Sequence, residues 1–116
     1  MTKSIHLHFA AAALAAFLVA GMAGIAAADE ATLTLTLKNH KFDPLVPTVP
    51  AGVRVKITAT NADDSPAEIE SGDFKLEKVV PAGKTVVVTI GPLKPGTYKI
   101  YDEYHEDEST TDFIAK

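Results

Sequence analysis

The chain has 116 residues, with 11 basic and 15 acidic side chains, no cysteine and no tryptophan. This length fits a single domain, and the formal net charge of −4 has the wrong sign for holding a nucleic-acid backbone. The lack of cysteine excludes disulfide scaffolds, thiolate zinc or iron–sulfur sites and cysteine nucleophiles. It also removes the thiolate that a blue-copper centre requires.

The N-terminal segment has the pattern of an export signal. Lys3 lies near the start, the run Phe9–Ala28 carries no charge, and its end Ala26-Ala27-Ala28 directly precedes Asp29. This pattern predicts a secretory signal peptide over residues 1–28, cleaved before Asp29, and a periplasmic location. The alternative is a retained membrane anchor, because twenty apolar residues can span a bilayer. The Ala- and Gly-rich composition and the lack of a following basic cluster favour cleavage.

Beyond the predicted leader, polar and apolar residues alternate with a period of two. The strands that this alternation predicts are, in chain order, residues 32–37, 53–58, 85–90, 98–100 and 113–115. Turn residues separate them, and no window shows helical spacing. We therefore expect residues 29–116 to form one all-β domain, a sandwich or a small barrel.

Two long connections between these strands are acidic. The first spans residues 61–70 and the second spans residues 102–112. Alternate loops of a sandwich gather at one end, so we expect the two connections to meet. Their negative charges would then repel each other unless a cation lies between them. The alternative is that both are ordinary solvated loops of an acidic protein.

A series of short motifs carries a resemblance to a known family. The motifs are Phe42-Asp43-Pro44, Val49-Pro50-Ala51-Gly52, Asn61 with residues 65–71, residues 77–84, residues 91–98 and Tyr101-Asp102-Glu103-Tyr104-His105. With this order and spacing, Leu33 to Lys116 resembles a cupredoxin. More narrowly, it resembles the cysteine-free, EfeO-type and FtrB-like cupredoxin-like domains of bacterial iron uptake. The resemblance implies a Greek-key β-sandwich.

The resemblance also implies an altered metal site. Blue-copper members bind their ion through a His, then a Cys three residues before a second His, and then a Met. The corresponding positions here are Glu68, Asp102 and His105, and no Met follows residue 28. Hard oxygen in place of soft sulfur suits iron, Mn²⁺ or Cu²⁺. We therefore expect an iron or copper ion at a non-blue site.

The spacing of the acidic residues bears on the same site. Glu68 and Glu70 are two apart, so on a strand both would point to one face. Asp102 and His105 are three apart, a spacing that a turn can bring to one ion. Glu103 would point away from Asp102 if the strand continues. The predicted metal ligands are Glu68, Glu70, Asp102, Glu103 and His105.

The remaining histidine of the domain, His40, lies in a different setting. It stands between Lys38 and Lys41 at the end of the first predicted strand. Two flanking positive charges disfavour a cation there, so we interpret His40 as a surface residue with at most a minor part in metal binding.

Three functions fit this pattern. The first is a periplasmic metal-binding accessory in iron or copper uptake, whose partners would be the metal ion, a periplasmic iron-binding protein and a membrane iron permease. The second is a ferroxidase component of such a system, which needs a redox-active ion with an open position. The third is a metal-free interaction module. Hydrolysis is not expected, because no nucleophile and base are paired with an orienting group.

Overall fold

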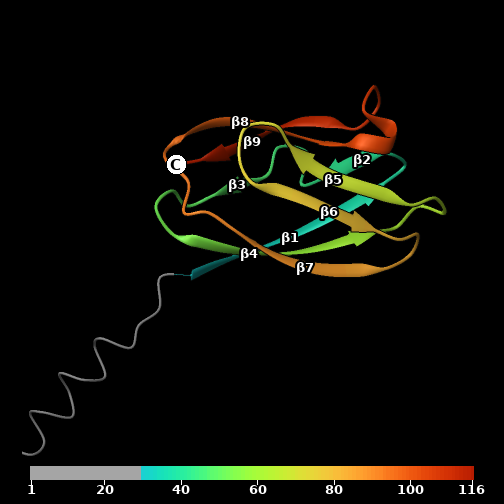
Figure 1. Cartoon of the computed structure of the whole chain (residues 1–116), viewed down its shortest axis with the longest axis horizontal. Coiled ribbons are helices and arrows are strands. Elements are labelled where there is room, and N and C mark those ends of the chain that lie inside the picture. Colours follow the sequence, from blue (N-terminus) through green and yellow to red (C-terminus); the bar gives the residue numbers. More distant parts are fainter. Residues whose placement is uncertain (1–29) are drawn as a thin grey trace, which may run out of the picture.

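The computed structural model describes residues 30–116, which form two β-sheets packed face to face (Figure 1). The elements are β1 (Glu30–Lys38), β2 (Lys41–Asp43), β3 (Thr48–Val49), β4 (Arg54–Asn61), β5 (Ala67–Ser71), β6 (Leu76–Val80), β7 (Thr85–Ile90), β8 (Gly96–Asp102), the 3₁₀ turn η1 (Glu103–His105) and β9 (Thr110–Ala115). This confirms the expected all-β sandwich. Within residues 30–116 no helix is long and apolar enough to cross a membrane. The predicted signal peptide lies outside the described residues.

One sheet has four strands in the order β2-β1-β4-β7, and the other has five in the order β3-β9-β8-β5-β6. The alternation seen in the sequence places one side of each strand in the core. Leu35 and Leu37 of β1 face Ile100 and Phe113 of the other sheet's strands within one buried cluster. Burying each such side chain stabilises the fold by roughly 1.5–3 kcal/mol.

The first acidic connection contains a strand that the sequence analysis treated as a loop. Strand β5 pairs with β6 on one side and β8 on the other, inside the five-stranded sheet. Its inward side chains are Ala67, Ile69 and Ser71. Ala and Ser contribute little to an apolar pattern, so the alternation here is faint. The neighbouring β6 buries only its two end residues, and β2 and β3 are very short.

Three connections meet at the end of the sandwich that lies away from the C-terminus (Figure 1). They are the β1–β2 turn, the β4–β5 loop and the segment from η1 to β9. The Asp63 carboxylate accepts from the backbone N–H of Asn39, and Ser109 Oγ donates to the carbonyl of His40. The expectation that the two acidic segments share one end is confirmed.

The sandwich contains its own core. Its fifteen buried hydrophobic side chains all lie between Leu35 and Ala115, and the strands pair with one another. Residues 30–116 therefore contain a hydrophobic core of their own, as a domain that folds by itself does.

Candidate metal centre

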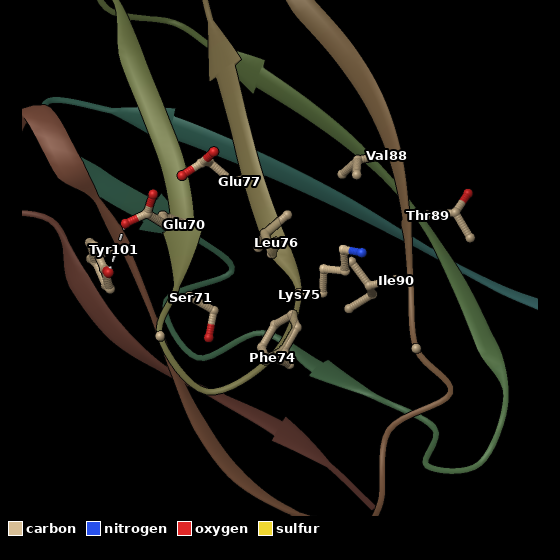
Figure 2. A pocket seen from close by; sticks show the side chains of 12 residues that line it. Glu70, Ser71, Phe74, Lys75, Leu76, Glu77, Val88, Thr89, Ile90 and Tyr101 are labelled. Carbon is tan, nitrogen blue, oxygen red and sulfur yellow. Dashed lines mark hydrogen bonds between the residues drawn. The ribbon is translucent and has the colours of Figure 1, made fainter.

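The outer face of the five-stranded sheet carries a row of glutamates. On β5, Glu68 and Glu70 alternate with buried residues, so both point outward on the same face. Glu70 lies opposite Glu77 of β6 and opposite Tyr101 of β8. The Tyr101 hydroxyl donates to Glu70 Oε2 at 2.9 Å (Figure 2).

Glu103 joins this row from η1. One carboxylate oxygen each of Glu68, Glu70 and Glu103 lies within 4.8 Å of the others. We call these three residues the glutamate group. Among the described residues, no Lys, Arg or His forms a salt bridge with any of them. Two ligands on opposite sides of an ion at ~2.1 Å lie about 4.2 Å apart, so small side-chain movements would close the group around one cation.

The closeness of the glutamate carboxylates, with no positive charge among them, shifts their pKa values. The neighbouring Glu70 carboxylate, through a shared hydrogen bond and its charge, raises the pKa of Glu103 to about 7. Hydrogen bonds from Glu103, Glu77 and Tyr101 lower the pKa of Glu70. The hydrogen bond from the Tyr101 hydroxyl to Glu70 raises the pKa of Tyr101 to about 12. A bound cation would supply the positive charge that these carboxylates lack.

A pocket of about 780 Å³ adjoins this row but does not contain the glutamate group. Its lining comes largely from β6, β7 and the β5–β6 turn, with Phe74, Leu76 and Ile90 among the apolar residues. Glu70 and Tyr101 lie at one side of it (Figure 2). Of the glutamate group only Glu70 lines the pocket, whose other carboxylate belongs to Glu77.

Asp102 lies on the other side of the sheet. It is opposite the buried Ile69, and its exposed fraction is 0%. Its Oδ1 accepts from the backbone N–H of Glu68 at 2.9 Å and of Tyr104 at 3.1 Å. Its Oδ2 pairs with Nδ1 of His105 at 2.8 Å. Asp102 therefore fixes the start of η1 and the position of the His105 ring together.

His40 is held against these residues by a tight turn. Lys38 and Lys41 pair across β1 and β2, which leaves a two-residue turn with φ of 51° at Asn39 and 60° at His40. Positive φ at both positions is the geometry of a type I′ hairpin turn. The two oxygens of Asp63 accept from both backbone N–H groups, at 2.6 and 3.0 Å. Burial opposes ionisation of Asp63, but these two N–H donors outweigh it and lower the pKa of Asp63.

This turn brings the two histidines of the domain into contact. The ring centroids of His40 and His105 are 4.3 Å apart, with 35° between the ring planes. One ligand atom each of His40, Asp102 and His105 lies within 4.8 Å of the others. We call these three residues the imidazole group. His40 Nδ1 is buried, and it is the one buried side-chain nitrogen or oxygen of residues 30–116 without a hydrogen-bond partner.

The structure thus divides the five predicted ligands between two groups. Glu68, Glu70 and Glu103 lie outward, whereas Asp102 lies inward and carries His105. The cause is the register of the sheet, in which the buried Ile69 is opposite Asp102 and the flanking Glu68 and Glu70 point to the other face. The contact between Glu68 and Asp102 is a hydrogen bond from the backbone N–H of Glu68 to Asp102 Oδ1, and the Glu68 carboxylate takes no part in it.

His40 is the residue that sequence reasoning placed outside the site. The two lysines beside it argued against metal binding, but the Nζ of one of them, Lys41, donates to the backbone carbonyl of Glu108. A signal was available in the turn itself. A two-residue hairpin turn with positive φ at both positions favours Gly or Asn. A histidine adopts this conformation at a cost, which indicates that the residue has a further role.

The sequence profile of the cupredoxin-like domain matches residues 9–115. This chain belongs to the cupredoxin-like family. A relative, the uncharacterized protein RP394 of Rickettsia prowazekii (strain Madrid E), is 38% identical over 73 residues, which are 63% of this chain and 58% of that protein. The chain thus matches less than two thirds of the relative's length.

Solved structures share the fold at low sequence identity. The metal-binding domain of the Cu(I)-exporting P-type ATPase CopA of Streptococcus pneumoniae D39, with Cu(I), is 12% identical with a TM-score of 0.66, covering 76% of this chain and 87% of that one. A purple cupredoxin from Nitrosopumilus maritimus is 19% identical with a TM-score of 0.55, covering 72% and 99%. Reduced auracyanin from Roseiflexus castenholzii is 16% identical with a TM-score of 0.61, covering 73% and 96%.

The residues of this chain do not fit a blue-copper site, because the chain has no cysteine. The position that resembles the copper thiolate holds Asp102, whose buried carboxylate is hydrogen-bonded to His105. Oxygen and imidazole donors fit a non-blue ion instead.

Proposed function

We propose that this cupredoxin-like protein is a periplasmic metal-binding accessory of iron uptake, or of copper uptake, and that it takes up its ion at the glutamate group. The observation that carries the proposal is the meeting of three carboxylates, within 4.8 Å of one another, on the outer face of the sheet. Salt bridges to these glutamates are lacking within residues 30–116. Oxygen-only donors favour iron and Mn²⁺ over softer ions.

An open face also suits a protein that passes its ion on. Glu103 is exposed and Glu68 and Glu70 are half-buried, so a partner can approach the group from solvent. We infer that the partners are a periplasmic iron-binding protein and a membrane iron permease, with the predicted signal peptide directing export. A carrier of this kind needs an ion bound by exchangeable carboxylates rather than enclosed in the core.

Calorimetry of segment 29–116 with Fe²⁺ under anaerobic conditions, and with Mn²⁺, tests the proposal. We expect about one ion per chain at this group, and a loss of at least about tenfold in affinity in the double variant Glu68→Gln/Glu70→Gln, because two ligand charges are removed. Asp64→Asn, on the exposed β4–β5 loop, is the matched control and should bind normally. No binding, or equal binding in the double variant, would overturn the proposal.

A turnover assay distinguishes the ferroxidase alternative from the proposed carrier. If the site oxidises Fe²⁺, aerobic solutions will lose many equivalents of Fe²⁺ per chain faster than the buffer alone. A carrier will protect or release one equivalent without sustained oxygen consumption. The same Glu68→Gln/Glu70→Gln variant then shows whether any turnover belongs to the glutamate group.

A further inference from the structure

The imidazole group has the composition and position of a second metal site. The geometry points to a site for a divalent late transition metal, Cu²⁺ most tightly, bound by His40, Asp102 and His105 on the inner side of the sheet end. This inference extends the proposed metal-binding function but stands on different residues from the glutamate group.

The first argument is the orphaned nitrogen of His40. An unpaired buried polar atom such as His40 Nδ1 has lost its contacts with water without replacement, so native proteins leave few of them. Asp63 Oδ2 is 3.7 Å from this Nδ1, too far for a hydrogen bond. The ring of His105 lies against the same imidazole. A metal ion shared by the two rings would provide the missing partner.

The second argument is that His40 is held in place by its backbone. Its left-handed conformation is one that a non-glycine residue adopts at a cost, and such positions persist where the surroundings enforce them. Here Asp63 accepts from its N–H, and the buried Ser109 donates to its carbonyl at 2.6 Å. The buried Asn61 in turn accepts from the N–H of Asp63 at 3.0 Å. This chain of contacts fixes the backbone from which the ring projects before any ion arrives.

The third argument is the donor set. Two imidazoles and one carboxylate suit Cu²⁺, Zn²⁺, Ni²⁺ and Fe²⁺, and among divalent first-row ions Cu²⁺ binds nitrogen and oxygen donors most tightly. Asp102 Oδ1 is held by two backbone N–H groups, which leaves Oδ2 for the ion once the hydrogen bond to His105 is exchanged. Glu108 Oε2 lies 3.8 Å from His40 Nε2 and can add a further oxygen.

An ion has a route to this group from solvent. A pocket of about 400 Å³ opens beside the His105 ring, lined by Tyr104, Glu106, Asp107 and Glu108. Three of these four residues are acidic, so the entrance attracts cations. Beside this pocket, Lys41 Nζ donates a hydrogen bond to the backbone carbonyl of Glu108.

Counting imidazoles on bound Cu²⁺ tests the inference directly, because residues 29–116 contain only two histidines. Pulsed electron paramagnetic resonance of the Cu²⁺ complex of segment 29–116 should detect two coordinated imidazoles. In His40→Asn we expect one imidazole and an affinity at least ~10–100-fold weaker, the loss that even an outer-shell partner causes. Asn tolerates the left-handed turn, so the variant should fold, and its melting temperature checks this.

The glutamate variants keep the two proposals apart. Glu68→Gln/Glu70→Gln should retain both imidazoles on Cu²⁺ while losing Mn²⁺, and His40→Asn should keep Mn²⁺ binding. A parent complex with one imidazole or none, or unchanged Cu²⁺ affinity in His40→Asn, would overturn the second site. A parent chain that binds Cu²⁺ through two imidazoles but fails to bind Mn²⁺ would overturn the proposed function alone.

Discussion

The two groups at the sheet end hold their carboxylates in opposite ways. On the outer face, Glu68, Glu70 and Glu103 face solvent and one another, with few protein hydrogen bonds to hold them. On the inner side, the carboxylate of Asp102 is fully buried and makes three hydrogen bonds to the protein. The first arrangement is short of positive charge and is suited to taking up a cation. The second is satisfied by the fold and positions a neighbour.

The comparison shows that the carboxylates of two consecutive residues can have different roles. Asp102 and Glu103 are consecutive, yet they belong to different groups because β8 ends at the buried Asp102 and the exposed Glu103 begins the turn η1. The inner carboxylate contributes to folding as well as to the inferred Cu²⁺ site, whereas the outer ones contribute to binding alone. Substitutions should therefore separate stability from metal affinity.

The largest effect is expected for Asp102→Ala. The change leaves the backbone N–H groups of Glu68 and Tyr104 without an acceptor in a buried place, and each unpaired donor costs roughly 1–3 kcal/mol. We expect the free energy of unfolding to fall by about 2–5 kcal/mol. Urea denaturation followed by circular dichroism measures it. A loss no greater than that of the control Asp64→Asn would mean that the inner carboxylate is not structural.

A smaller loss is expected for Asp63→Ala. This side chain accepts from the backbone of Asn39 and His40 in the turn, which is closer to solvent than Asp102. The free energy of unfolding should fall by about 1–2 kcal/mol, because two hydrogen bonds to a carboxylate are lost where water can partly replace them. Cu²⁺ affinity should fall with it, since the His40 ring is no longer fixed. Stability unchanged together with unchanged Cu²⁺ affinity would contradict the role given to Asp63.

The outer glutamates should show the opposite behaviour. Glu70→Gln removes one of three mutually repelling charges, so the melting temperature of the metal-free segment should stay the same or rise slightly. Mn²⁺ affinity should drop by at least about tenfold, since one ligand charge is gone. Thermal melts with and without Mn²⁺ measure both effects, because an ion that binds only the folded state raises its stability. A variant that melts earlier without metal would show that Glu70 is structural.

The smallest effect is a pH dependence confined to the glutamate group. The pKa of Glu103 is raised to about 7 in the folded chain, from an ordinary value of 4.5. Between these values the folded state binds more protons than the unfolded state, so metal-free stability should fall as pH rises from about 4.5 to about 7. Mn²⁺ uptake below pH 7 should release protons for the same reason.

Glu103→Gln is the control for this pH dependence. Its neutral side chain cannot titrate, so both the slope of stability with pH and the proton release on Mn²⁺ binding should shrink. Calorimetry in two buffers of different ionisation enthalpy counts the protons. An equal release in Glu103→Gln would assign the titration to another residue, such as Glu77, whose pKa the Glu70 carboxylate also raises.

Much of the fold could be predicted because alternation is a local property. Strands with Leu, Val and Ile inward, such as β1, β4 and β7, were evident in the sequence. Strand β5 was missed since its inward residues include Ala67 and Ser71, whose small side chains give a weak pattern. The predicted meeting of the acidic segments followed from the topology of a sandwich and is confirmed.

The grouping of the site residues could not be predicted in the same way. Which face of β5 lies beside Asp102 depends on its register with β8, where Ile69 rather than Glu68 is opposite Asp102. The contribution of His40 depends on a turn held by Asp63 and Ser109, which are 23 and 69 residues away along the chain. These are long-range contacts that no local pattern in the sequence encodes.

The central claim, that the ion is bound by outer-face glutamates, is tested most directly by crystals of segment 29–116 grown with Mn²⁺ and examined by anomalous diffraction. The account predicts an anomalous peak between the carboxylates of Glu68, Glu70 and Glu103. No peak at that position, with Mn²⁺ instead between His40 and His105 or absent from the chain, would contradict it.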